Sequence, residues 1–220
     1  SDSIYFVPPE GVCDPEAFTG RVQEILPDGI EVELDATYAS MFSYKAKNYA
    51  LLAHDGTVSI TGAALKSRGL ERFQRNYIRD LIELLLHGRA EQAADLADEY
   101  KRKIKTHEFS LADFAKREVL STPPAVYREK LEAGKGRRSA AYELVLAADR
   151  AYRQGDQVAF YVTGQKKNVS VTGNSKLLSE AEPGARDENI PYYLDKMDKL
   201  ESKFREFLPK GPGKGLPLFE

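Results

Sequence analysis

The stretch NYALLAHDGTVSIT, residues 48–61, together with LERFQRNYIRDLIELLL, residues 70–86, decides the fold class. In the first stretch two β-prone runs flank an Asp-Gly pair, and that pair is a common turn of a β-hairpin. In the second, apolar residues recur every three or four positions and Gly88 follows, which is typical of an amphipathic helix with a glycine stop. The sequence therefore predicts an α+β protein in which antiparallel strands come first and helices follow.

The chain before the hairpin is also expected to be mixed. Residues 4–7 form an apolar β-prone run, and the strict alternation of residues 30–34 predicts a half-buried strand. Between them Asp14 and Pro15 predict an N-cap and a first helical residue, with a helix to about residue 26. We expect residues 1–68 to form one α+β domain.

The chain after the hairpin is expected to be mainly helical. Further helices are predicted over residues 90–103, 111–118, 124–131 and 139–154, with a strand at 157–162. A last amphipathic helix is marked by Tyr193, Met197, Leu200, Phe204 and Phe207. Residues 69–208 are therefore predicted to be a helical domain, followed by a tail, residues 209–220.

Composition excludes several classes of protein. The 220 residues include 32 Lys and Arg against 34 Asp and Glu, so a net charge of -2 does not by itself indicate nucleic acid. One cysteine, Cys13, excludes an internal disulfide, and three separated histidines do not have the spacing of a metal site. No leader and no run of about 18 apolar residues is present, so we expect a cytoplasmic protein without a membrane span. The basic residues nevertheless gather in clusters that favour local positive fields: Lys45/Lys47, Lys66/Arg68/Arg72/Arg75/Arg79, Lys101/Arg102/Lys103/Lys105, Lys135/Arg137/Arg138 and Lys166/Lys167.

Asp2 stands between two serines at the head of the apolar run of residues 4–7. It is either a solvated residue near the terminus or a carboxylate that holds a hard cation such as Mg²⁺. On the second interpretation Ser1-Asp2-Ser3 resembles the end of the Asp-Thr-Asp-Ser motif of family B DNA polymerases, with Asp2 at the second Asp. That resemblance implies that Asp2 is a catalytic metal ligand.

Two basic segments follow Asp2 in the order of that family. Residues 45–49 resemble its Lys-Lys-Arg-Tyr motif, with Lys47 and Tyr49 matching, which implies that Lys45, Lys47 and Tyr49 hold the primer end. Residues 61–68 resemble its Lys-Gly-Leu-Glu-x-x-Arg-Arg segment, which implies that Lys66 and Arg68 contact DNA. From the residues alone, a charged strand edge that prevents aggregation and a solvated loop explain the same lysines and arginines.

The tail combines a Pro/Gly/Lys tether, residues 209–215, with the apolar side chains of Leu216, Leu218 and Phe219, which we expect to be exposed. It resembles the Gln-Leu-x-Leu-Phe tail by which bacterial polymerases bind the sliding clamp, with Gly215 in place of Gln. A tail that folds back onto the last helix is the alternative.

The resemblance as a whole implies a C-terminal piece of a family B DNA polymerase of bacterial type. Residues 1–68 would be the end of the palm (strands and one helix), 69–208 the thumb, and 209–220 the clamp-binding tail. The complete enzyme would be a nucleotidyltransferase of DNA replication or repair. It would add deoxynucleoside triphosphates to primer–template DNA with two Mg²⁺ ions. The remaining carboxylates are expected outside this chain, so the piece alone is expected to be inactive. Two alternatives stay open: a stand-alone duplex DNA-binding module and a clamp-binding adaptor without catalysis.

Overall fold

The computed structural model describes residues 4–8, 11, 14–66, 69–184 and 186–208. Its first sheet contains the antiparallel strands β1 (Ser40–Lys45), β2 (Asn48–Leu52) and β3 (Val58–Thr61), in that order. The predicted hairpin is β2–β3, and at its turn the Asp55 carboxylate accepts a hydrogen bond from the Thr57 backbone N–H at 2.8 Å. Strand β1, which the sequence did not predict, pairs with the other side of β2.

The segment before β1 has one helix, α1 (Pro15–Gln23), whose N-terminus is capped by Asp14 as predicted. The strands predicted at residues 4–7 and 30–34 are wrong, because neither segment has a neighbouring strand in the described part of the chain. Instead the Gln23 side chain donates to the carbonyl of Ile30 at 2.7 Å and accepts from the N–H of Val32 at 2.8 Å. One amide side chain thus satisfies backbone groups that a partner strand would pair.

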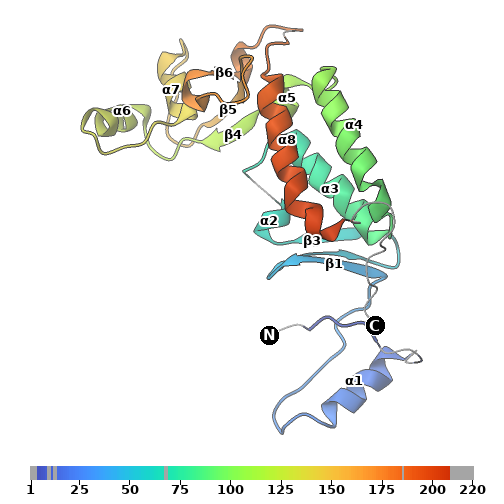
Figure 1. The fold of residues 1–220 in the computed structure, drawn as a ribbon. Helices are drawn as coiled ribbons and strands as arrows, with labels where there is room; N and C mark the ends of the chain where they lie inside the picture. The colour runs from blue at the N-terminus through green and yellow to red at the C-terminus, as the bar shows by residue number, and fades with distance from the viewer. Residues whose placement is uncertain (1–3, 9–10, 12–13, 67–68, 185, 209–220) are drawn as a thin grey trace.

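A helical body packs on the first sheet (Figure 1). It consists of α3 (Arg72–Leu86), α4 (Ala93–Lys105) and α8 (Ile190–Phe204), with the short α2 (Ala63–Lys66), α5 (Leu111–Phe114), η1 (Ala90–Gln92) and η4 (Arg205–Phe207). The apolar stripe of α3 predicted from the sequence is buried, and Phe73, Tyr77 and Leu81 are fully covered. Sheet and helices share this core, since the Tyr44 ring of β1 lies 5.1 Å from the Phe204 ring of α8. The domain division at residue 69 stays a prediction.

A second lobe, residues 116–180, projects from the top of the helical body (Figure 1). We call it the distal lobe. It contains an antiparallel sheet of β4 (Lys116–Val119), β5 (Gln157–Val162) and β6 (Ser175–Leu177), the helices α6 (Pro124–Glu132) and α7 (Ala140–Ala147), and the short η2 (Val171–Gly173) and η3 (Leu178–Glu180). Its own core is built around Leu120, Val158 and Phe160.

Two helices predicted in this region are shorter than expected. The helix predicted at residues 111–118 stops at Phe114 because Ala115 is extended, with ψ of 126°, and residues 116–119 pair with β5. The helix predicted at residues 139–154 stops at Ala147, since Ala148 is extended with ψ of 147°. The helices and two antiparallel sheets confirm the predicted α+β fold, and the second sheet, which the sequence did not predict, lies between α5 and α8 in the chain.

Candidate nucleic-acid interface

Lys45 and Lys47 lie at the tight turn between β1 and β2. The two lysines do not share one face of a strand, because β1 ends at Lys45, the pairing is irregular there, and Lys47 has a left-handed φ of 60°. The Asn48 side chain donates to the Ala46 carbonyl at 2.9 Å and accepts from the Ala64 N–H at 2.8 Å. Asn48 therefore ties this β1–β2 turn, which we call the lysine turn, to the start of α2.

Gly62 allows this turn and α2 to approach each other closely. Its φ is +99°, and a Cβ at this position would lie 2.3 Å from both the Lys47 carbonyl oxygen and the Asn48 Oδ1. Four residues later Lys66 ends α2, whose Leu65 side chain is buried. The side chain of Leu65 thus fixes the position of a helix that carries a lysine beside the turn.

An open groove of about 960 Å³ lies between the lysine turn, α2 and the last turn of α8. Its lining includes the apolar side chains of Tyr44 and Phe204 and three lysines, Lys45, Lys66 and Lys203. None of the three forms an ion pair with a carboxylate in the described part of the chain, and Lys45 Nζ lies 5.1 Å from the centroid of the Tyr44 ring. We call this open groove the lysine groove. Three uncompensated cations on apolar walls favour an anionic ligand.

Lys203 was missed by the sequence reasoning. The periodicity of α8 identified its buried side chains, Leu200 and Phe204, but it does not say which neighbour each exposed position faces. Only the packing of α8 against β1 places Lys203 beside Lys45.

Tyr49, predicted to hold the primer end, contacts a residue 44 positions earlier in the chain. The Tyr5 hydroxyl donates to the Tyr49 hydroxyl at 3.3 Å, and the ring centroids are 5.3 Å apart. This hydrogen bond lowers the pKa of the Tyr49 hydroxyl and raises the pKa of Tyr5 to about 12. The contact places the segment before α1 against the first sheet.

The structure thus brings four predicted DNA-binding residues to one region, with Lys45, Lys47 and Tyr49 at the β1–β2 connection and Lys66 on α2. The others lie outside the described residues: Asp2, Arg68, Leu216, Leu218 and Phe219. Their roles stay predictions. Among the described side chains no group of three or more His, Cys, Asp and Glu residues is placed to hold a metal ion. The described helices include none long and apolar enough to cross a membrane.

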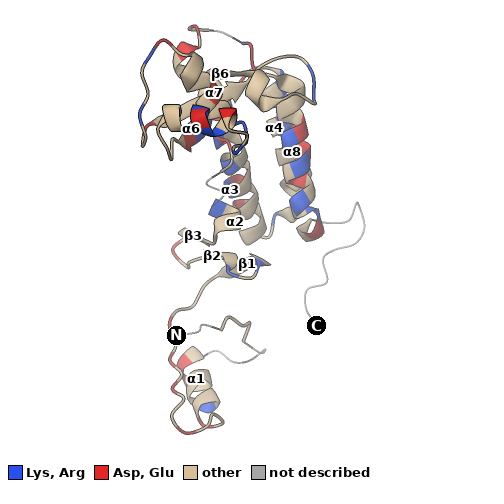
Figure 2. Cartoon of the chain, turned by 90° about the vertical axis from the view of Figure 1, so that its left-hand side faces the viewer, with Lys and Arg blue, Asp and Glu red and all other residues tan. Residues whose placement is uncertain are grey.

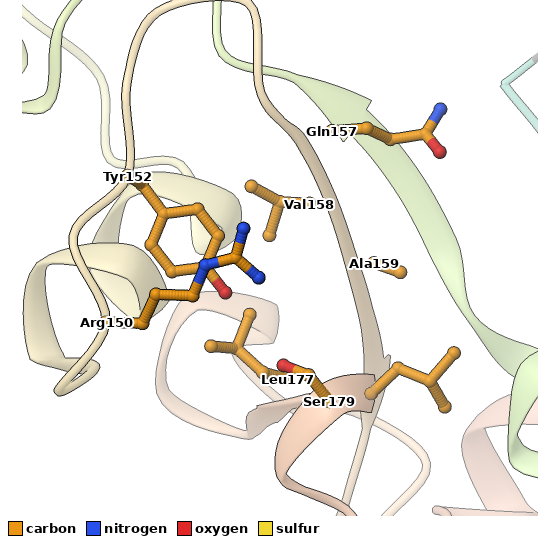
Figure 3. A pocket seen from close by; sticks show the side chains of 8 residues that line it. Arg150, Tyr152, Gln157, Val158, Ala159, Leu177 and Ser179 are labelled. Carbon is orange, nitrogen blue, oxygen red and sulfur yellow. The ribbon is translucent and has the colours of Figure 1, made fainter.

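The distal lobe has a smaller pocket of about 290 Å³ (Figure 3). Its walls include Val158 and Leu177, and the Arg150 guanidinium lies 5.1 Å from the centroid of the Tyr152 ring. It holds one cation against three in the lysine groove, so the groove is the stronger candidate for a polyanion.

Comparisons with known proteins identify the relatives of the chain. No protein-family profile matches it. A DNA polymerase of Archaeoglobus fulgidus is 28% identical over 136 residues, which are 60% of this chain and 17% of that protein. The family B DNA polymerase of the hyperthermophilic archaeon Pyrobaculum calidifontis has a similar structure, with a TM-score of 0.66 and 18% identity over 91% of this chain and 25% of that one.

The chain is similar in sequence to part of a DNA polymerase and in fold to part of a family B DNA polymerase. This confirms the predicted resemblance, and the matched structure shows that the chain has the fold of a part of such a polymerase. Both relatives are archaeal, and the bacterial type stays a prediction. Because the chain spans only about a sixth to a quarter of the polymerases it matches, the activity, substrates and partners of a whole polymerase enter below as proposals.

Proposed function

We propose that the chain grips primer–template duplex DNA through phosphate contacts in the lysine groove. The observation that carries this proposal is the convergence of Lys45, Lys66 and Lys203, from three separate elements, without a carboxylate partner among the described residues. Lysines that neutralise phosphates release counterions and position a duplex without reading its sequence. Such contacts suit a polymerase, which must hold any primer–template.

The salt dependence of duplex binding tests this proposal. Affinity for a short primer–template is measured by fluorescence anisotropy at several salt concentrations, for the chain and for the Lys45→Ala/Lys66→Ala/Lys203→Ala variant. If each lysine neutralises one phosphate, the slope of log affinity against log salt becomes shallower by about 2.7, at about 0.9 per contact. The control is Arg89→Ala/Lys105→Ala, which removes two exposed cations that do not line the groove, since Arg89 precedes η1 and Lys105 is the last residue of α4. An unchanged slope in the groove variant would refute phosphate contacts in the groove.

Within a polymerase that supplies the remaining motifs, we propose that Asp2 is one ligand of a two-Mg²⁺ site for nucleotidyl transfer from deoxynucleoside triphosphates. The ions would activate the attacking 3′-hydroxyl and support the leaving pyrophosphate. The support is the relation to DNA polymerases together with the Ser1-Asp2-Ser3 pattern. In such an enzyme Asp2→Ala is expected to reduce nucleotide incorporation by orders of magnitude and leave duplex affinity unchanged. Incorporation at the normal rate would contradict the role of Asp2.

We also propose that Leu216, Leu218 and Phe219 bind a sliding clamp. The support is their spacing behind a Pro/Gly/Lys tether, which gives the enzyme a high local concentration at the primer end when the clamp is on DNA. Deletion of residues 216–220 is expected to abolish clamp binding in surface plasmon resonance without changing duplex affinity. Equal clamp binding by the truncated chain would exclude this peptide.

A further inference from the structure

The face of the first sheet that the helical body does not cover carries the side chain of Tyr49. Ala50 and Leu52 of β2 belong to the core shared with the helices, so the alternation along a strand turns Tyr49 to the opposite face. The first sheet lies between the helical body and α1 in two views at right angles (Figure 1, Figure 2). Residues 4–8, which we call the leading segment, lie on the α1 side of the sheet.

Two adjacent aromatic side chains fasten the leading segment. The Tyr5 hydroxyl donates to the Tyr49 hydroxyl at 3.3 Å, and the two ring centroids are 5.3 Å apart. Phe6 contacts α1 instead, since its ring centroid lies 4.9 Å from that of Phe18. Val7, by contrast, is 91% exposed. Tyr5 thus holds the leading segment to the sheet, and Phe6 holds it to α1.

The hydrogen bond leaves the two hydroxyls with different roles. The bond to Tyr49 raises the pKa of Tyr5 to about 12, whereas the bond from Tyr5 lowers the pKa of Tyr49. Tyr5 is therefore the donor, and the proton of the Tyr49 hydroxyl remains available to donate to another acceptor. Phosphate and sugar oxygens of DNA are such acceptors. With the ring contact, the bond also restricts the rotation of the Tyr49 side chain.

The Tyr5–Tyr49 contact connects two segments of the proposed function. Asp2, the proposed Mg²⁺ ligand, precedes Tyr5 by three positions, and Tyr49 follows Lys47 of the lysine turn by two. Three residues of extended chain reach at most about 10 Å. The contact therefore bounds the distance between the proposed metal ligand and the tyrosine predicted to hold the primer end.

We propose that Tyr5 is a positioning residue for the primer end: its hydroxyl holds the Tyr49 side chain in the orientation that contacts the last nucleotide of the primer. This inference rests on the proposed function, since Tyr49 acts on DNA only if the chain grips primer–template duplex. Tyr5 itself does not touch the DNA. It removes, before binding, rotational freedom that the Tyr49 side chain would otherwise lose on binding.

The preference of the chain for a primer end measures this effect. Affinities are measured by fluorescence anisotropy, at one salt concentration, for a DNA stem-loop with a recessed 3′ end and for a dumbbell with the same stem closed by loops at both ends. The ratio of the two affinities is the primer-end preference. A change in stability or in phosphate binding alters both affinities alike, so a residue with a merely structural role does not change this ratio.

Three variants separate the role of Tyr5 from that of Tyr49. Tyr5→Phe keeps the ring and removes the donor, and it should lower the preference by about fivefold, the value of one neutral hydrogen bond. Tyr49→Phe should lower it at least as much, and Tyr5→Phe/Tyr49→Phe no more than Tyr49→Phe alone, because Tyr5 acts only through Tyr49. The matched control is Tyr38→Phe, which removes the hydroxyl of another exposed tyrosine near Tyr5 and should keep the preference. Circular dichroism checks that each variant is folded.

The outcomes distinguish this inference from the proposed function. The role of Tyr5 is overturned by an unchanged preference in Tyr5→Phe or Tyr49→Phe, by single losses that multiply in the double variant, by the same loss in the control, or by an unmodified chain without a preference. None of these results touches the lysine groove. A Lys45→Ala/Lys66→Ala/Lys203→Ala variant that binds both DNAs like the unmodified chain refutes the groove instead, and the proposed function with it.

Discussion

Gly62 is predicted to be essential for the lysine turn, and Gly62→Ala tests this. The φ of +99° already disfavours alanine by about 1–2 kcal/mol. The added Cβ would also lie 2.3 Å from the Lys47 carbonyl oxygen, a backbone atom that cannot rotate away, and 2.3 Å from Asn48 Oδ1. The turn and α2 must therefore separate.

The added Cβ also displaces the Asn48 side chain, whose Cγ would lie 2.6 Å from it, and this removes both hydrogen bonds of that side chain, to Ala46 and Ala64. At about 1 kcal/mol each, these bring the expected loss in free energy of unfolding to about 3 kcal/mol. The change also moves Lys66 relative to Lys45, so duplex affinity is expected to fall under conditions in which the variant remains folded.

Urea unfolding measures the stability of the variant, and Gly56→Ala is its matched control. Gly56 lies in the β2–β3 turn with a similar φ of +86°, but a Cβ there meets no atom within 4 Å. Gly56→Ala therefore costs only the penalty of placing alanine at a left-handed φ. Alanine also lowers the conformational entropy of the unfolded chain, which offsets part of that cost, so the expected net loss in free energy of unfolding is about 1 kcal/mol. Equal losses for Gly62→Ala and Gly56→Ala would refute the close approach of the turn and α2.

Two further predictions concern single contacts. Tyr49→Phe removes the acceptor of the Tyr5 hydroxyl, so the pKa of Tyr5 should fall from about 12 toward its ordinary value of 10, as measured by NMR titration of ¹³C-labelled tyrosine. The native contact needs the Tyr5 proton and is lost as pH rises through the pKa of Tyr5, and a pKa that stays near 12 in the variant would contradict the contact. Lys196→Met leaves the Glu71 carboxylate, 3% exposed, without its cation and should destabilise the fold by about 3–5 kcal/mol in urea unfolding. The control Lys199→Met, at a side chain 72% exposed, should cost less than about 1 kcal/mol, and equal losses would show that the Glu71 pair is not a buried one.

Elements whose pattern is local were predictable from the sequence. Helix α3 has seven buried residues along one stripe, and α6 and the β2–β3 hairpin have turn or cap residues at their ends. The motif order from Asp2 to Arg68 also pointed to the family B DNA polymerases, and the chain is similar in sequence to a DNA polymerase and in fold to a family B DNA polymerase. These signals lie within short stretches, so no knowledge of packing was needed to detect them.

Only the tertiary structure decided the elements and sites that depend on distant partners. Residues 30–34 alternate like a strand, but Ile30 and Val32 bond the Gln23 side chain instead of a neighbouring strand, whereas residues 116–118, expected to be helical, pair with β5 as part of β4. The lysine groove combines Lys45 and Lys203, which are far apart in the chain and meet because α8 packs its Phe204 on β1. The physical reason is the same in each case: strand pairing and charge convergence require a partner distant in the chain, and a local pattern cannot identify that partner.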